Sequence, residues 1–209
     1  MQRPVSLPRI AAVSAAALFV ASVAGFGAAF DTFSHMQHPV AALGASGVPR
    51  AGAFNVAGFV VPGLLAAVVA QMLRSRMADT RFGARLGVQV LTLAALAFAA
   101  LGLLPLDSSD LMSAASRLHA AAWTAWWVAF MAGALLLAVG MRGTPHARRC
   151  WQVVACAVAT LAFALLLPGL LPVGLAQRVA FAAWFAGVIL LAPSGSAASS
   201  RGSSPTGPA

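Results

Sequence analysis

The chain has 209 residues, of which 61% are hydrophobic and 8% are charged, and its mean hydropathy is +0.89. Soluble domains carry about 25% charged residues, so this chain cannot cover a water-facing surface, and a soluble globular protein is excluded. The apolar runs are continuous and about twenty residues long, as in membrane-spanning helices. Barrel strands would be about ten residues long and alternating. The sequence therefore predicts an all-α, polytopic membrane protein.

The formal net charge of +9 does not indicate nucleic-acid binding. The basic residues are all arginine and lie in short loops between apolar runs, which is the pattern that sets orientation in a membrane. We therefore expect membrane lipids, and no nucleic acid, among the partners. Cys150 and Cys156 stand in one apolar run, where we expect two small helix residues and no disulfide framework.

Six membrane spans are predicted along the chain. Their approximate bounds are residues 10–30, 54–73, 86–104, 120–140, 151–171 and 179–192. The basic N-terminus and first apolar run also resemble a secretory signal peptide, but the run exceeds the usual core of roughly 7–15 residues, so we expect an uncleaved span. Residues 1–193 would form one transmembrane domain, and the small, polar residues 194–209 would form a disordered cytoplasmic tail.

The arginines predict the orientation, because six spans place both termini on one side of the membrane. That side holds Arg3, Arg9, Arg74, Arg76, Arg81, Arg85, Arg142, Arg148, Arg149 and Arg201. The opposite side holds only Arg50, Arg117 and Arg178. Cytoplasmic loops carry the excess of basic residues, so we expect cytoplasmic termini in a bacterial inner membrane.

Most other ionisable residues fall on the predicted outer face. They are Asp31, Asp107, Asp110, His35, His38 and His119. Matched numbers of acidic and basic groups suggest internal pairing more than a solvated surface. Asp31, Ser34, His35 and His38 fall at positions i, i+3, i+4 and i+7, so they would share one face if the first helix continued past residue 30. The proline that follows His38 limits this continuation.

These residues allow three interpretations. One is plain helix ends and capped loops. Another is a zinc site formed by His35, His38 and His119, as in a membrane-embedded hydrolase, with Asp31, Ser34 and Asp107 as candidate catalytic residues. The third is a binding site for a small molecule or lipid head group. No HExxH, GxSxG or CxxC motif indicates an enzyme, and whether the chain is one stays open.

Each outer arginine stands near the start of an even-numbered span. A cation at a helix N-terminus opposes the helix dipole, at a cost of up to about 1 kcal/mol. Three such placements suggest anionic partners, either the outer aspartates or lipid phosphates. A transporter is a further alternative, disfavoured because no charged residue lies in the middle of a predicted span.

Three motifs carry a family resemblance. The segment HPVAALGASGVPRAGAFNVAGFVVPG, followed by GLLPLD and RLHAAAW, resembles the bacterial and archaeal integral membrane proteins grouped as domain of unknown function 998 (DUF998). The resemblance spans roughly residues 10–192 and implies a six-helix membrane protein without an assigned activity. The positions that look like the family's motifs are His38, Pro39, Gly44, Asn55, Pro105, Asp107 and His119.

The leading hypothesis is therefore an inner-membrane protein whose outer polar cluster binds a small ligand or lipid head group. The motif positions and the outer arginines together supply the candidate binding residues. These are His38, Arg50, Asn55, Asp107, Arg117, His119 and Arg178.

Overall fold

The computed structural model describes residues 6–193, and the predicted tail lies outside this range. Within it the chain is helical and contains no strand. Six helical stretches are long and apolar enough to cross a membrane: Leu7–Ala28, Ala51–Arg74, Phe82–Leu103, Ala114–Gly140, Ala147–Gly169 and Val173–Leu191. The predicted all-α, six-span fold is confirmed. Every stretch begins before its predicted start. In the first, third, fourth, fifth and sixth stretches the added residues include polar or charged side chains that an apolar run excludes.

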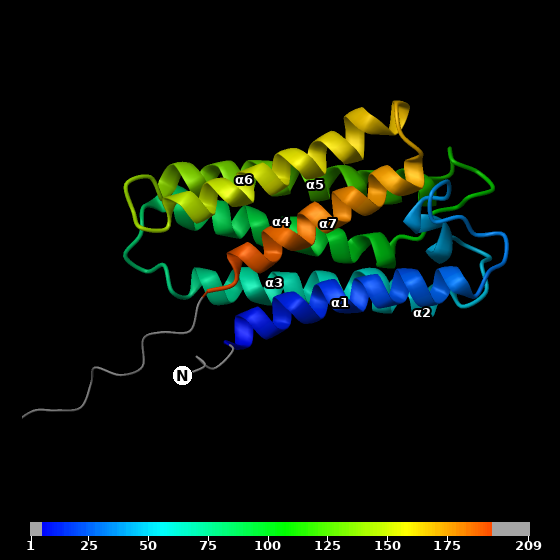
Figure 1. Ribbon diagram of the computed structural model, residues 1–209, viewed down its shortest axis with the longest axis horizontal. Helices are drawn as coiled ribbons and strands as arrows, with labels where there is room; N and C mark the ends of the chain where they lie inside the picture. Colours follow the sequence, from blue (N-terminus) through cyan, green and yellow to red (C-terminus); the bar gives the residue numbers. More distant parts are fainter. Residues whose placement is uncertain (1–5, 194–209) are drawn as a thin grey trace, which may run out of the picture.

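The elements follow the chain as α1 to α7, with short 3₁₀ and π segments labelled η. Their bounds are α1 Leu7–Ala28, η1 Val40–Gly44, α2 Ala51–Phe54, η2 Asn55–Val60, α3 Val61–Arg74, α4 Phe82–Leu103, α5 Ala114–Gly140, α6 Ala147–Leu161, η3 Ala162–Leu166, η4 Leu167–Gly169 and α7 Val173–Leu191. The six spans lie side by side along the long axis of the molecule (Figure 1).

The bundle has two chemically different ends. We call the end formed by residues 29–50, 104–113 and 170–172 the histidine end, and the end formed by residues 75–81 and 141–146 the arginine end. In Figure 1 the histidine end lies on the right, and the start of α1 and the end of α7 lie on the left with the arginine end. The loops predicted to share the outer face therefore meet at one end of the molecule.

Two spans depart from regular α-helix, both next to a proline. In the second span α2 passes into the π segment η2, and Pro62 follows at the second position of α3. In the fifth span α6 passes into the π segment η3 and then into η4, which contains Pro168. Proline lacks an N–H and its ring crowds the carbonyl four residues earlier. The wider π turns accommodate the crowded backbone, and such segments are frequent at functional sites.

Glycines let α4 and α5 approach closely. A Cβ atom added at Gly87 would lie 2.5 Å from the backbone nitrogen of Leu137 and 2.9 Å from the carbonyl oxygen of Gly133. Small residues at helix interfaces allow backbone-to-backbone packing, which drives association where lipid weakens the hydrophobic force. The close distance between α4 and α5 therefore depends on glycines, which have no side chain, at the contact.

Aromatic rings fill the centre of the bundle. The Phe98 ring on α4 lies 5.5 Å from that of Phe59, 5.7 Å from that of Phe181 and 5.7 Å from that of Trp126. Large apolar side chains on the outside, such as Val20 and Leu93, are exposed. The helices thus present an apolar surface to membrane lipid around an aromatic core.

Candidate functional site

The helix α1 does not continue past residue 30, so the condition under which Asp31, Ser34, His35 and His38 would share one helical face is not met. The helix α1 ends at Ala28, and residues 30–39 form turns. The chain folds back on the helix end, because a Cβ at Gly27 would lie only 2.5 Å from the Cε1 atom of His35. Because the chain turns back here, the helix does not continue, and Asp31 is exposed.

Ser34 and His38 close a compact turn. The backbone N–H of His38 donates to the carbonyl oxygen of Ser34 over 2.9 Å. The backbone N–H of Ser34 donates to Nδ1 of His38 over 2.8 Å. Because Nδ1 of His38 accepts this hydrogen bond, the proton of the neutral ring is on Nε2. We call residues 34–38 the histidine turn.

Arg178, on α7, holds the histidine turn. Its Nη1 donates to the carbonyl oxygens of Gly174, over 2.8 Å, and His38, over 3.2 Å. Its Nη2 lies 3.0 Å from Nδ1 of His35. A guanidinium has only donors, so Nδ1 of His35 is the acceptor and that ring is neutral. The guanidinium carbon also lies 5.7 Å from the centre of the Phe33 ring.

The first turn of α7 packs directly against the histidine turn. The backbone N–H of Leu175 donates to the carbonyl oxygen of Met36 over 3.1 Å. At Gly174, an added Cβ would lie 2.6–2.8 Å from the carbonyl oxygens of His38, Met36 and His35. The Met36 carbonyl thus accepts from an N–H group in the first turn of α7 that has no partner inside the helix, and the missing side chain of Gly174 makes this close approach possible.

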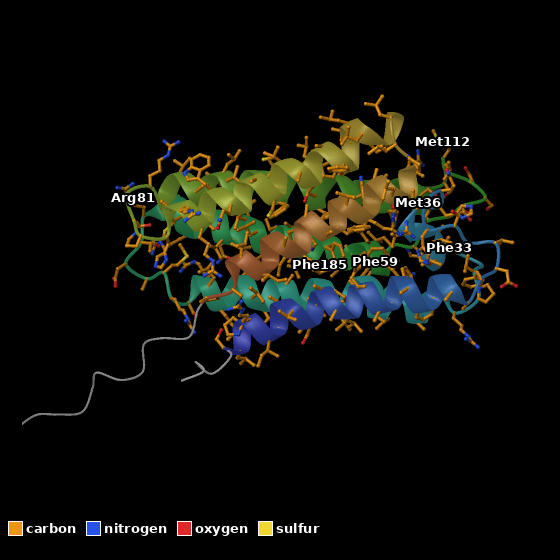
Figure 2. All side chains as sticks on the ribbon, viewed as in Figure 1. Phe33, Met36, Phe59, Arg81, Met112 and Phe185 are labelled. Atoms are coloured by element: carbon orange, nitrogen blue, oxygen red, sulfur yellow. The ribbon has the colours of Figure 1, made fainter. Side chains whose placement is uncertain are left out.

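A groove runs from this cluster into the apolar part of the molecule, between α1 and α7. Its volume is about 480 Å³. It is lined by Ala16, Phe19, Val20, Val23, Ala24, His35, Arg178, Ala182, Phe185, Ala186 and Ile189. In Figure 2 the labelled Phe33 and Met36 lie at the histidine end and Phe185 lies farther along the bundle. Arg178 and His35 are the only ionisable residues among those lining this groove.

Asp107 is held by its own loop and does not join the cluster. Its Oδ1 accepts hydrogen bonds from the hydroxyl and the N–H of Ser109, at 2.6 and 3.0 Å, and from the N–H of Asp110 at 3.3 Å. The Ser109 hydroxyl contributes most to lowering the pKa of the Asp107 carboxyl, so the carboxylate persists to lower pH. Asp107 therefore shapes its own loop, and among the described residues it is not a partner of Arg178.

The other predicted binding residues are dispersed. Arg50 and Arg117 are exposed. Asn55 is buried, and its side-chain nitrogen donates to the carbonyl oxygen of Gly44 over 2.9 Å, which fixes η1 on the second span. His119 is also buried, and its Nδ1 lies 2.7 Å from the carbonyl oxygen of Leu104. His119 lines a separate cavity of about 300 Å³.

The predicted three-histidine arrangement is not assembled. His35 and His38 lie at the histidine turn, whereas His119 is anchored on Leu104 in its own cavity. In the part of the chain that the structure describes, no group of three His, Cys, Asp or Glu side chains could hold a metal ion. The geometry therefore offers no ligand set for the zinc-hydrolase interpretation.

Sequence reasoning missed Phe33, Gly174 and Gln177. The oxygen Oε1 of Gln177 accepts a hydrogen bond from the N–H of Val40 over 2.9 Å. Gly174 ends the sequence GLLPVG and stands four residues before Arg178. That spacing puts the glycine one helical turn from the arginine, and it was the signal that α7 contributes to the site.

Comparison with family models gives one match. A model described as a protein of unknown function, DUF998, matches residues 13–194. The resemblance seen in the three sequence motifs is thereby confirmed. Comparisons with curated proteins and with solved structures gave no match.

Proposed function

The chain belongs to the DUF998 family of proteins of unknown function, and from that premise we propose that this multi-pass membrane protein binds an anionic phospholipid. The phosphate lies at Arg178 and an acyl chain lies in the groove between α1 and α7. The observation that carries the proposal is a partly buried arginine, beside His35, at one end of a groove whose other lining residues are apolar.

The contacts of Arg178 leave its charge without an anionic partner. Among the described residues its hydrogen-bond partners are two backbone carbonyls and the neutral ring of His35. Its Nε atom is buried and makes no hydrogen bond within residues 6–193. Buried charges are ordinarily paired, and arginine suits phosphate because its planar fork donates two parallel hydrogen bonds. A phosphate supplies both the missing charge and the missing acceptor.

The apolar walls suit an acyl chain. The groove residues on α1 extend from Ala16 to Ala24, which at the helical rise corresponds to about 12 Å. Four of the lining residues are alanines, which leave space between the two helices. A ligand with an anionic head and an apolar tail matches this arrangement. A free phosphate would leave the apolar walls unused.

The distribution of arginines supports a site in the outer leaflet. The arginine end and the helix turns beside it carry Arg74, Arg76, Arg81, Arg85, Arg142, Arg148 and Arg149, and basic residues gather on the cytoplasmic side. The histidine end then faces out of the cytoplasm, in a bacterial inner membrane. Alkaline phosphatase fused after Ser108 should be active, and the same enzyme fused after Gly143 should be inactive. The reverse result would place the site in the inner leaflet.

The change Arg178→Gln should reduce retention of phosphatidylglycerol about tenfold, because hydrogen bonds to charged groups contribute about 1.5–3 kcal/mol each. Native mass spectrometry of purified protein, titrated with phosphatidylglycerol, measures the retained lipid. Arg178→Lys should recover part of the loss, since lysine keeps the charge without the fork. Arg117→Gln is the matched control, because that arginine is exposed and outside the groove.

Arg178→Gln could lower lipid retention indirectly by loosening the histidine turn, so a second variant is needed. Ala182→Leu fills the groove and leaves every contact of Arg178 in place. It should also lower phosphatidylglycerol retention. Equal retention by the wild type, Arg178→Gln and Ala182→Leu would refute the proposed function.

A further inference from the structure

We infer that the outward-facing side of α4 binds a second copy of this chain, so that two α4 helices pair in parallel around a two-fold axis. The side chains on this side recur at alternating intervals of four and three residues, which is the heptad spacing of paired helices. We call these positions the α4 seam: Phe82, Leu86, Gln89, Leu93, Leu96, Ala100 and Leu103. All are exposed except Ala100, which is half-buried. The seam extends over about 31 Å at the helical rise, close to the thickness of about 30 Å of the hydrocarbon core.

The other sides of α4 are already packed inside the chain. Toward α5, a Cβ added at Gly87 would lie 2.5 Å from the backbone nitrogen of Leu137. Toward α3, a Cβ added at Gly63 would lie 2.6 Å from the backbone nitrogen of Ala99. The α4 seam faces away from both neighbours, so its side chains meet either lipid or another protein.

A cluster of amide and hydroxyl groups interrupts the apolar seam. The Nε2 atom of Gln71, on α3, donates to Oε1 of Gln89 over 3.2 Å and to the hydroxyl oxygen of Thr92 over 2.8 Å. The Thr92 hydroxyl donates in turn to the carbonyl oxygen of Val88 over 3.1 Å. Both protons of the Gln71 amide and the hydroxyl proton of Thr92 are therefore used within the chain.

The cluster keeps one unused donor group and one unused acceptor. The Nε2 atom of Gln89 and the Oε1 atom of Gln71 make no hydrogen bond within residues 6–193. Both glutamines belong to membrane spans, and Gln89 lies about 10 Å along α4 from its first residue, Phe82. Acyl chains offer no hydrogen bond, so an unpaired amide at this depth is costly. Glutamine side chains in spans characteristically bond to a neighbouring helix.

A second copy of the chain supplies both missing partners. Every copy crosses the membrane in the same direction, so a two-fold axis along the membrane normal places each seam residue opposite itself in the other copy. The Gln89 amide of each copy then donates to an amide oxygen of the same cluster in the other copy. The seam is thus self-complementary, which a lipid or an unrelated helix is not. A single polar residue in an apolar heptad seam also fixes the register of the two helices.

The change Gln89→Leu should weaken dimerisation about tenfold, because interhelical hydrogen bonds in membranes are individually modest and the two-fold axis uses this amide twice. Dimerisation is measured by energy transfer between donor- and acceptor-labelled copies of the full chain in phosphatidylcholine liposomes, as the protein-to-lipid ratio is lowered. Gln152→Leu is the matched control, because it makes the same change at an exposed glutamine of α6. It should dimerise like the wild type.

Cysteine crosslinking locates the interface independently of the amide. In a background with Cys150→Ala and Cys156→Ala, Leu93→Cys should form disulfide-linked dimers in membranes, because the two-fold axis places residue 93 of the two copies face to face. Val128→Cys is the control, since Val128 is 45% exposed on α5, outside the α4 seam. It should give little crosslinked dimer.

Three results would each overturn the inference: a wild-type chain that stays monomeric at every density, Gln89→Leu that dimerises like the wild type, or crosslinking at Val128→Cys as strong as at Leu93→Cys. The dimer and the lipid site can fail separately, because the α4 seam shares no residue with the α1–α7 groove. Arg178→Gln should accordingly leave dimerisation unchanged, and Gln89→Leu should leave phosphatidylglycerol retention unchanged.

Discussion

Replacing Gly87 with leucine should abolish correctly folded protein. A Cβ at this position would lie 2.5 Å from a backbone nitrogen and 2.9 Å from a carbonyl oxygen of α5, and backbone atoms cannot rotate away as a side chain can. Overpacking costs typically about 1–3 kcal/mol and occasionally more. A leucine placed between two backbones belongs at the upper end, because α4 and α5 must separate along their length.

The matched control lies on the same helix. Gly83→Leu makes the identical chemical change at a position where an added Cβ meets nothing within 4 Å. Size-exclusion chromatography in detergent and the midpoint of thermal unfolding compare the two variants. Gly87→Leu should aggregate or unfold well below the wild type, and Gly83→Leu should match it. A stable, monodisperse Gly87→Leu protein would show that α4 and α5 do not pack as described.

Gly174→Ala should detach the histidine turn from α7. The added methyl group would lie 2.6–2.8 Å from three carbonyl oxygens of the turn, so the turn must move by several tenths of an ångström. That movement weakens the hydrogen bond from Leu175 to Met36 and the contacts of Arg178. We expect a loss of about 1–3 kcal/mol in stability and weaker phosphatidylglycerol retention.

Gly169→Ala is the control for this prediction. It adds the same methyl group five residues earlier, where no atom lies within 4 Å. Thermal unfolding and native mass spectrometry are applied to both variants. Unchanged unfolding temperature and lipid retention in Gly174→Ala would mean that the histidine turn and α7 are not closely packed.

Composition predicted the architecture, because a chain with 8% charged residues has few alternatives to membrane helices. Pro62 and Pro168 stand in the two irregular spans, and the arginine-poor loops meet at one end of the bundle. The predicted spans began too late, as at the fourth span, which was predicted from residue 120 and begins at Ala114. The first turn of a helix can be polar, so a search for apolar runs leaves it out.

The site was only partly predictable because its geometry depends on tertiary contacts. The helical spacing of Asp31 and His35 does not bring them onto one face, because the chain turns back onto Gly27 after α1 ends. Three histidines predicted on the same membrane face suggested one metal site, but the side chain of His119 is anchored on the backbone carbonyl oxygen of Leu104. Arg178 was a candidate from the sequence, whereas its partners came from a turn 140 residues away. No local pattern encodes such a pairing.

Photo-crosslinking tests the phospholipid groove most directly. The wild-type protein is reconstituted with phosphatidylglycerol that carries a photoreactive group on its acyl chain, and the labelled residues are mapped by mass spectrometry. Labels should concentrate on α1 between residues 16 and 24 and on α7 between residues 182 and 189, and unlabelled phosphatidylglycerol should displace them better than phosphatidylcholine. Labels spread evenly over the exposed faces of all six spans, without preference for the head group, would contradict the proposed function.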